Sequence, residues 1–346
     1  MPDPINVALI GYGYAGRTFH APLIRATPGL HLAAVVSSRP AAVHAALGDI
    51  VVVADIDTVL ADPAIDLVVV ATPDALHARH ALAALDAGKH VVVDKPFALS
   101  LAEARAMTGR AQDRGLTLSV FHNRRWDSDF LTLRHLIDQG VLGTVTQVES
   151  HFDRFRPEVR DRWREQPGAG IWRDLGPHLV DQALQLFGPP LAVYADLGMQ
   201  RAGAVATDYF HVLLRYPQLR VILHASVLTP ASWLRLAVHG SRGSFIKYGF
   251  DLQEAALAAG QPAAGEGWGT DPVPGQLTVI GEDGLPAGAT LETVPGDYRR
   301  FYAGIRDCLN GAGPNPVPPD QALAVMAVLD AAIASADQQR EILLTQ

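Results

Sequence analysis

The feature that most constrains the fold is the glycine-rich sequence Gly11-Tyr12-Gly13-Tyr14-Ala15-Gly16, which directly follows the apolar run Val7–Ile10. Glycines at this spacing, between a strand and a helix, are typical of a βαβ unit that binds a dinucleotide. The first permits the tight turn, the second lets backbone approach a pyrophosphate, and the third lets the helix pack closely on the strand. We predict cofactor contacts along the whole turn. A turn that holds no ligand is the alternative that the pattern leaves open.

The first 120 residues alternate between short β-branched runs and alanine-rich stretches such as 75–87 and 101–114. The β-branched runs are Val7–Ile10, Leu32–Val36, Val51–Val53, Leu67–Val70, Val91–Val93 and Leu116–Phe121. Strand and helix in alternation predict βαβ crossovers and a parallel sheet. Runs that are apolar on both faces predict that helices cover both sides of that sheet.

After residue 121 the pattern changes to longer strands joined by short turns. Residues 209–227 predict one hairpin and residues 234–248 predict another, which indicates an antiparallel sheet. We therefore expect an α/β chain with a dinucleotide-binding Rossmann domain over residues 1–122. An α+β substrate-binding domain with a large, mostly antiparallel sheet is expected over residues 123–346. Its last helix, 321–336, repeats apolar residues at helical spacing and is a candidate to pack back on the first domain.

The charge pattern argues against nucleic acid as a partner, because the net charge is −8 and no lysine-rich or arginine-rich run occurs. The one cysteine, Cys308, cannot form an internal disulfide. No basic segment precedes the first apolar run, and we expect no apolar stretch of membrane-spanning length. These observations predict a cytoplasmic chain that contacts neither nucleic acid nor membrane.

The end of the second predicted strand, Val36-Ser37-Ser38-Arg39, indicates which dinucleotide is bound. An NAD site usually carries Asp or Glu here to bind the ribose 2′-hydroxyl. Serine removes the repulsion that a carboxylate would exert on a 2′-phosphate, and the Arg39 guanidinium can bind that phosphate. We predict NADP rather than NAD, with Thr72 and Pro73 after the fourth strand also facing the cofactor. A solvated Arg39 at a helix start is the alternative.

A lysine follows the fifth predicted strand, within Asp94-Lys95-Pro96. An ammonium group there can bind a hydroxyl oxygen and stabilise the negative charge that develops as hydride leaves the adjoining carbon. We predict that Lys95 is catalytic and that Lys95 and Pro96 lie beside the cofactor. Together with the glycine-rich turn, this lysine favours an oxidoreductase over a simple nucleotide-binding protein.

A second polar cluster lies in Trp172–Asp181, where Asp174 and His178 are four residues apart. On one helix this spacing lets both side chains address one spot, and Asp181 follows one turn later. A carboxylate beside an imidazole orients the ring and stabilises its charged form, as a general base needs. This interpretation places Pro177 in the first turn of the helix and lets the glycines of 168–170 bring backbone close to a ligand. The alternative is a helix cap at Asp174 and an ordinary, partly buried His178.

These motifs stand in the order and context that they have in the Gfo/Idh/MocA oxidoreductase family, which the chain resembles nearly from end to end. The usual Glu-Lys-Pro of that family is here Asp94-Lys95-Pro96, a conservative departure that keeps the lysine. Three stretches resemble in particular the NADP-dependent scyllo-inositol dehydrogenase group: Val120–Asp127, Arg154–Arg160 and His239-Gly240-Ser241.

The resemblance implies a Rossmann domain followed by an α/β domain, whose open sheet face often contacts another subunit in a homodimer or homotetramer. It implies hydride transfer between NADP(H) and a CH–OH or ketone group of a cyclic polyol or sugar, with scyllo-inositol and its inosose as the favoured pair. Carried over to this sequence, Lys95 binds the reacting hydroxyl, His178 takes its proton, and Asp174 supports the histidine.

The candidate substrate contacts are polar or aromatic side chains from the resembling segments: Asn123, Arg124, Trp126, Arg156 and Asp181. Arginine donors suit a ring of hydroxyl groups, although arginines that tie the two domains together are an equal alternative. Thirteen histidines raise the question of zinc. No cysteine or glutamate accompanies them at ligand spacing, so we predict no metal site.

Two other functions stay open. The same chemistry on another sugar or an anhydro-sugar would use the same residues, because the shape of the substrate pocket decides between them. A non-catalytic NADP-binding regulatory protein is the alternative from another class. Members of the family with such roles typically lack the lysine or the histidine, and this chain retains Lys95 and His178.

Overall fold

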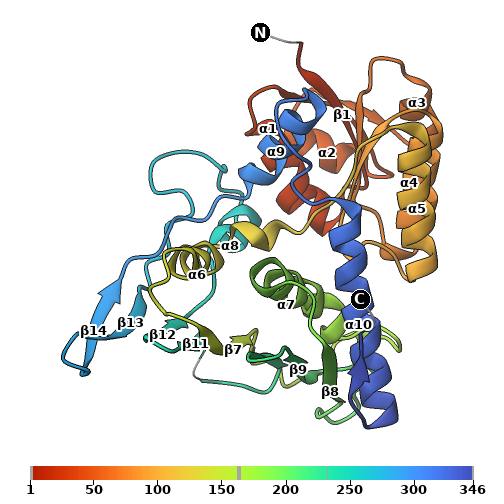
Figure 1. Ribbon diagram of the computed structural model, residues 1–346. Helices are drawn as coiled ribbons and strands as arrows, with labels where there is room; N and C mark the ends of the chain where they lie inside the picture. The colour runs from red at the N-terminus through yellow and green to blue at the C-terminus, as the bar shows by residue number, and fades with distance from the viewer. Residues whose placement is uncertain (1–2, 162–164, 232, 345–346) are drawn as a thin grey trace. The chain divides into compact units, whose positions relative to one another are not determined.

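The computed structural model describes residues 3–161, 165–231 and 233–344 (Figure 1). The chain divides into two compact units. The first comprises Met1–Asn123, Gln253–Trp268 and Asp297–Leu323, and the second comprises Arg124–Leu252, Gly269–Gly296 and Ala324–Gln346. The first division therefore falls one residue after the boundary predicted from the sequence. The two later segments of the first unit were assigned to the second domain by the sequence analysis.

The first unit contains a six-stranded parallel sheet with strand order β3-β2-β1-β4-β5-β6, which confirms the predicted Rossmann architecture. The strands are β1 (Ile5–Ile10), β2 (Leu30–Val36), β3 (Val51–Val53), β4 (Leu67–Val70), β5 (His90–Val93) and β6 (Leu118–Val120). The four residues of β4 are all buried, as expected for a strand covered on both faces.

The helices of the first unit connect these strands or come from its later segments. They are η1 (Gly16–His20), α1 (Ala21–Arg25), α2 (Pro40–Leu47), α3 (Ile56–Ala61), η2 (Asp74–Leu76), α4 (His77–Asp86), α5 (Leu101–Arg114), α8 (Gln253–Ala258) and α9 (Arg299–Leu309). Local sequence sets their ends: Ser100 Oγ accepts a hydrogen bond from the Glu103 backbone at the start of α5. Gly115, left-handed with φ of 63°, ends the same helix.

The second unit contains a nine-stranded sheet with order β14-β13-β12-β11-β7-β10-β9-β8-β15. Its strands are β7 (Val145–His151), β8 (Ala192–Gly198), β9 (Tyr209–Arg215), β10 (Arg220–Ser226), β11 (Leu234–Gly240), β12 (Gly243–Tyr248), β13 (Gly275–Ile280), β14 (Pro286–Leu291) and β15 (Ile342–Leu343). Neighbouring strands pair antiparallel, except that β7 and β10 are parallel. The large, mostly antiparallel sheet and both predicted hairpins are confirmed.

Helices cover one face of this sheet: α6 (Ser128–Asp138), α7 (Ile171–Phe187) and the later part of α10 (Pro319–Gln338) (Figure 1). A short turn, η3 (Asn123–Trp126), precedes α6. Burial alternates along β7, β9 and β10, so that one face of the sheet is packed under the helices and the other is partly exposed. The core between helices and sheet includes Phe152, Leu179, Phe210 and Val238.

By length and composition α10 could cross a membrane, since it has 20 residues and contains an 18-residue window with a mean hydropathy of 1.2. The expectation that no apolar stretch reaches this length is therefore wrong. However, Ala322, Val325, Val328 and Ala332 are buried inside the protein, which is the pattern of a core helix.

Candidate active site

The glycines of the turn after β1 have different surroundings. A Cβ on Gly11, whose φ is 99°, would lie 2.5 Å from the Ala71 carbonyl oxygen, and a Cβ on Gly16 would overlap the Gly11 carbonyl oxygen. Gly13 has no neighbouring atom within 4 Å of the equivalent position. The protein's own packing therefore requires glycine at positions 11 and 16. At position 13 the open space fits close approach by a cofactor.

Beside this turn lies a hollow of about 410 Å³, lined by Tyr12, Gly13, Tyr14, Arg17, Arg39, Ala42, Ala45 and Ala46. The Arg39 guanidinium donates a hydrogen bond of 3.4 Å to the Tyr12 carbonyl oxygen. The backbone N–H of Arg39 donates to Ser37 Oγ at 3.1 Å. The structure thus brings the predicted 2′-phosphate residues Ser37 and Arg39 to the glycine-rich turn. Arg17 adds a second guanidinium that the sequence analysis did not single out. The residues present fit a dinucleotide that carries an extra phosphate.

Lys95 follows β5 at the carboxyl edge of the parallel sheet, the edge that also carries Gly11 after β1 and Thr72 after β4. Its backbone N–H donates a hydrogen bond of 2.8 Å to Asp94 Oδ1. The Lys95–Pro96 peptide bond is cis. Cofactors and substrates of such sheets bind at this edge. Gly11, Thr72 and Lys95 each follow a strand that ends there.

A polar chain not recognised from the sequence supports Asp94. Asp94 Oδ1 lies 3.7 Å from Nε2 of the fully buried His20, whose Nδ1 is 2.6 Å from the Tyr302 hydroxyl. Burial by itself raises the pKa of the Asp94 carboxyl, but His20, His77 and Lys95 lower it by more. The net pKa lies below the ordinary value, and the carboxyl is ionised at neutral pH.

His77 ties the loops after β4 and β5 together. Its Nδ1 lies 2.8 Å from the Pro96 carbonyl oxygen, and its Nε2 lies 3.0 Å from the Thr72 carbonyl oxygen. Both acceptors are carbonyl groups, so both hydrogen bonds form together only when each ring nitrogen carries a proton. This role could not be predicted from the sequence, because His77 begins α4 and its acceptors belong to separate loops.

In the second unit, Asp174 and His178 lie one turn apart on α7, as their spacing predicted. His178 is buried, whereas Asp174 is partly exposed. The helix begins at Ile171, so the prediction that Pro177 lies in its first turn is wrong: Pro177 is inside the helix. Gly176 makes room for the buried Trp172 ring, since a Cβ there would lie 2.7 Å from a ring carbon.

Gly170 has a structural partner where the sequence suggested a ligand. Its φ is 101°, it forms a bridge with Thr207, and an added Cβ would lie 2.7 Å from the Thr207 backbone. Gly168 also has a positive φ of 82°, with nothing within 4 Å of an added Cβ. The close backbone approach at Gly170 therefore joins the start of α7 to the loop before β9.

Asp181 forms a buried, two-bond ion pair with Arg125. Arg125 Nε donates to Asp181 Oδ2 at 2.9 Å, and a terminal nitrogen donates to Oδ1 at 2.6 Å. Arg124 is also buried and pairs with Asp127 at 3.3 Å, with its guanidinium 4.9 Å from the centre of the Phe152 ring. Both oxygens of Asp181 are engaged, which favours a supporting role over direct substrate contact.

The other candidate substrate residues lie in different settings. Asn123 is buried at the end of the first long segment of the first unit, and Trp126 is partly exposed in η3. Arg156 is exposed, and its backbone is held on both sides: its N–H donates to Val227 and its carbonyl accepts from Arg201.

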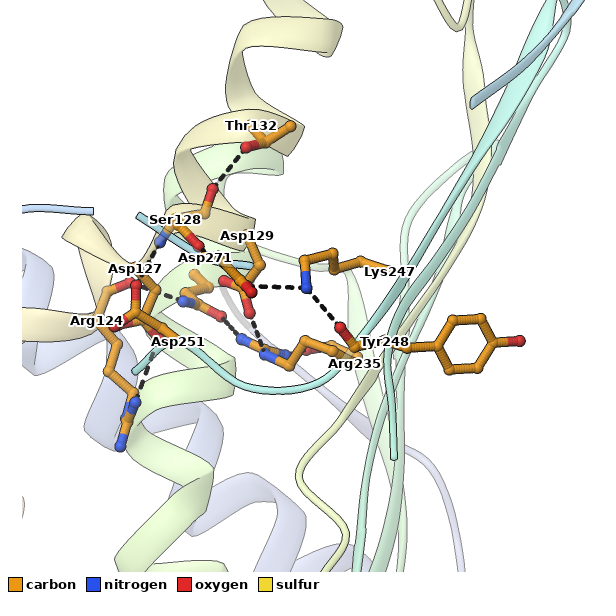
Figure 2. Close-up of polar contacts among 12 residues, drawn as sticks. Arg124, Asp127, Ser128, Asp129, Thr132, Arg235, Lys247, Tyr248, Asp251 and Asp271 are labelled. Atoms are coloured by element: carbon orange, nitrogen blue, oxygen red, sulfur yellow. Dashed lines mark hydrogen bonds and ion pairs between the residues drawn. The ribbon is translucent and has the colours of Figure 1, made fainter. Parts of the chain in front are cut away.

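Figure 2 shows a buried ionic network of the second unit that the sequence analysis missed. Lys247 Nζ lies 2.9 Å from Asp271 Oδ2, and Arg235 Nε lies 2.6 Å from Asp129 Oδ2. Asp251 Oδ2 accepts a 2.8 Å hydrogen bond from the Ser128 backbone at the start of α6. These contacts hold the start of α6 against β11 and β12. The helix α6 begins shortly after Arg124 and Arg125 in the sequence.

A β-bulge directs Arg235 into this network. The register of β11 shifts between Leu234 and Leu236, so Arg235 is the extra residue. Consecutive strand residues normally face opposite sides, yet Leu236 lies in the core and Arg235 bonds Gln182 of α7 at 2.7 Å. The bulge turns a charged strand residue toward the helices, a use that bulges often have near functional sites.

Two segments of the chain match the models of one oxidoreductase family, GFO_IDH_MocA. Residues 5–122 match its "NAD-binding Rossmann fold", and residues 134–344 match its "C-terminal alpha/beta domain".

Similar proteins cover the whole chain. The Escherichia coli protein named uncharacterized oxidoreductase YdgJ is 54% identical over 99% of this chain and 100% of its own length. The Bacillus subtilis scyllo-inositol 2-dehydrogenase (NADP(+)) IolW is 40% identical over 99% of this chain and 96% of its own length. A solved structure of a Yersinia pestis oxidoreductase superimposes with a TM-score of 0.98 at 53% identity, covering 100% of this chain and 99% of that one.

Proposed function

The chain belongs to the Gfo/Idh/MocA family of oxidoreductases, and we propose that it transfers hydride between NADP(H) and a CH–OH group of a cyclic polyol. The favoured pair of substrate and product is scyllo-inositol and its inosose. The observation that carries this proposal is the placement of Lys95 beside the ionised Asp94, at the sheet edge that also presents Gly13 and Thr72.

Each catalytic residue has one role in the proposed reaction. NADP, when bound, supplies the hydride acceptor. The Lys95 ammonium binds the reacting hydroxyl oxygen and stabilises the negative charge that develops there. His178 takes the hydroxyl proton, and Asp174, one turn before it on α7, orients the imidazole and stabilises its charged form.

The choice of NADP rests on Arg39, Arg17 and Ser37. Two guanidinium groups line the hollow beside the glycine-rich turn, and serine occupies the position where an NAD site usually has a carboxylate. The similarity to an enzyme whose name specifies NADP supports the same choice.

The cofactor proposal is tested by steady-state kinetics with each dinucleotide. We expect NADP to have the higher kcat/KM in the wild-type enzyme. Arg39→Ala should raise the KM for NADP about 10- to 100-fold, because a hydrogen bond to a charged group contributes about 1.5–3 kcal/mol. The KM for NAD should change little. A wild-type preference for NAD would contradict the proposal.

The substrate proposal is tested with a panel of inositols, aldoses and anhydro-sugars, each assayed by nicotinamide absorbance. We expect scyllo-inositol to give the highest kcat/KM. A higher kcat/KM for another sugar would support the proposed hydride transfer but contradict scyllo-inositol as the substrate. Tight NADP binding without turnover of any panel member would support a regulatory protein instead.

We also propose a homodimer or homotetramer, as the family resemblance implies. Light scattering coupled to gel filtration measures this directly. A monomeric mass at micromolar concentration would contradict it.

A further inference from the structure

The second unit gathers two histidines and an aspartate on the sheet face that α6 and α7 do not cover. His151 ends β7, Asp153 follows two residues later, and His224 lies on β10 directly opposite His151 in the parallel register. Phe152, between the first two, is buried in the core under the helices. The alternation therefore directs His151 and Asp153 to the opposite face of the sheet.

The possible ligand atoms of the three side chains all lie within 4.8 Å of one another. His151 Nδ1 is 3.3 Å from Asp153 Oδ2, and His224 Nε2 is 3.4 Å from Asp153 Oδ1. A tetrahedral zinc ion places neighbouring ligand atoms about 3.3–3.4 Å apart, since its bonds to nitrogen and oxygen are about 2.0–2.1 Å long. The two separations are of this size but involve different oxygens of Asp153, so rotation of its carboxylate is needed to bring one oxygen to the ion.

A fourth residue completes the pattern of a metal-binding histidine. His151 Nε2, the nitrogen remote from Asp153, lies 3.3 Å from Glu149 Oε2. Glu149 Oε1 is itself held by the Gln147 side chain at 2.8 Å. A histidine that binds metal through one nitrogen usually donates its other N–H to a carboxylate, which fixes the ring and increases its basicity.

The two carboxylates at this site, Glu149 and Asp153, also favour binding of a cation. Among the residues that the structure describes, neither Glu149 nor Asp153 pairs with a lysine or an arginine; their ionic partners are His151 and His224. The side chains of His151 and His224 are 15% and 16% exposed, so a metal ion and one water molecule can reach them from solvent.

We propose that His151 Nδ1, His224 Nε2 and one carboxylate oxygen of Asp153 form a zinc site, with Glu149 as the hydrogen-bond partner of His151. Three protein ligands leave the fourth tetrahedral position to water. The ion joins β7 to β10, the parallel pair among the strands that the structure describes in this sheet. It lies on the opposite face of the sheet from α7, which carries His178, so it takes no part in the proposed hydride transfer.

The test uses the full-length protein, stripped of metal with a chelator and titrated with zinc chloride by calorimetry. We expect one zinc ion per chain and a rise in the melting temperature on binding. Cobalt chloride should give the intense visible absorption of a tetrahedral site. Absence of stoichiometric zinc binding by the wild-type protein would overturn the proposal.

Two variants each remove one proposed zinc ligand, and a third removes the carboxylate that bonds His151. His224→Ala and Asp153→Asn should each abolish stoichiometric binding. The Ser226 N–H donates a 2.9 Å hydrogen bond to Asp153 Oδ1. The side-chain oxygen of asparagine can accept the same bond, so this variant should stay folded. Glu149→Gln should weaken zinc binding about 10- to 100-fold, the usual effect of changing a ligand's hydrogen-bond partner.

The matched control is His211→Ala. His211 is an exposed histidine on β9, opposite His224 in register, with ring centres 5.6 Å apart, and it lies outside the proposed ligand set. It should bind zinc like the wild type. Equal loss of binding in His211→Ala and His224→Ala, or wild-type affinity in Asp153→Asn, would refute the assignment.

Discussion

At the scale of single residues, the segment that carries Lys95 is supported by partners that lie far away in the sequence. The prediction that Lys95, Asp174 and His178 are catalytic rests on their types, their spacing and the family resemblance. Asp94 was recognised only as a departure from Glu-Lys-Pro, whereas its support by His20 and Tyr302 depends on residues remote in sequence. The same limit hid the proposed zinc ligands, because His224 lies far from His151 along the chain and joins it only through strand pairing.

Lys95→Ala should lower kcat about 10²- to 10³-fold, the usual cost of removing one donor to a developing oxyanion. Binding of NADP(H), followed by nucleotide fluorescence, should stay near wild type. Lys89→Ala is the contrasting variant: Lys89 is a buried lysine whose ammonium bonds two backbone carbonyls, so its loss should lower the melting temperature. Near-normal turnover by Lys95→Ala would contradict its role.

At the scale of secondary-structure elements, the strands and hairpins that depend on local sequence were predicted correctly. The runs of the first unit became β1 to β6, and both hairpins formed where their turns predicted. The strands β13 and β14 escaped notice because six-residue segments such as Pro286–Leu291 contain small residues and are largely exposed. The bulge in β11 was also invisible, since Arg235 within an alternating strand suggests an exposed charge.

Two substitutions in the glycine-rich turn separate folding from cofactor binding. Gly16→Ala should destabilise the protein by about 1–3 kcal/mol, because the new methyl group overlaps the Gly11 carbonyl oxygen. Gly13→Ala should change stability by less than about 0.5 kcal/mol yet weaken NADP binding, since its methyl group fills open space. Denaturant unfolding and nucleotide titration measure the two effects. Similar destabilisation by both variants would disprove the distinction.

Removing Arg235 should show how strongly the bulge depends on its ion pair. Arg235→Leu leaves Asp129 buried without its 2.6 Å partner, which should cost about 3–5 kcal/mol in unfolding free energy. The double variant Arg235→Leu/Asp129→Leu removes both charges and should regain much of that loss. Denaturant melts of the three proteins provide the comparison, and an additive loss in the double variant would count against the ion pair.

At the scale of the whole molecule, the sequence indicated two domains and a first boundary beside the observed one. It did not indicate that residues 297–323 belong to the nucleotide-binding unit. Their contacts explain the grouping: Phe301 packs edge-on against Phe121 with ring centres 4.9 Å apart. In addition, the Val317 carbonyl accepts hydrogen bonds from Ser119 and from the Val120 backbone in β6. Such pairings link positions far apart in sequence, where periodicity carries no information.

Phe301→Ala should therefore destabilise the nucleotide-binding unit, although it lies late in the chain. Its ring is fully buried, and truncation of a buried phenylalanine costs about 3–5 kcal/mol. The melting temperature should fall, and saturating NADP should restore part of the loss because the cofactor binds the folded form. Phe155→Ala, at an exposed phenylalanine, should change the melting temperature little. Equal effects of the two substitutions would exclude this account.

The assignment of residues 297–323 to the first unit has a consequence for synthesis on the ribosome. Domains generally fold as they are made, from the N-terminus onward. Here β6 lacks its hydrogen bonds to Val317, and Phe121 lacks its neighbour Phe301, until residues 301 and 317 have been translated. The six strands of the first sheet and strands β7 to β14 of the second unit are therefore all synthesised before the first unit gains these contacts.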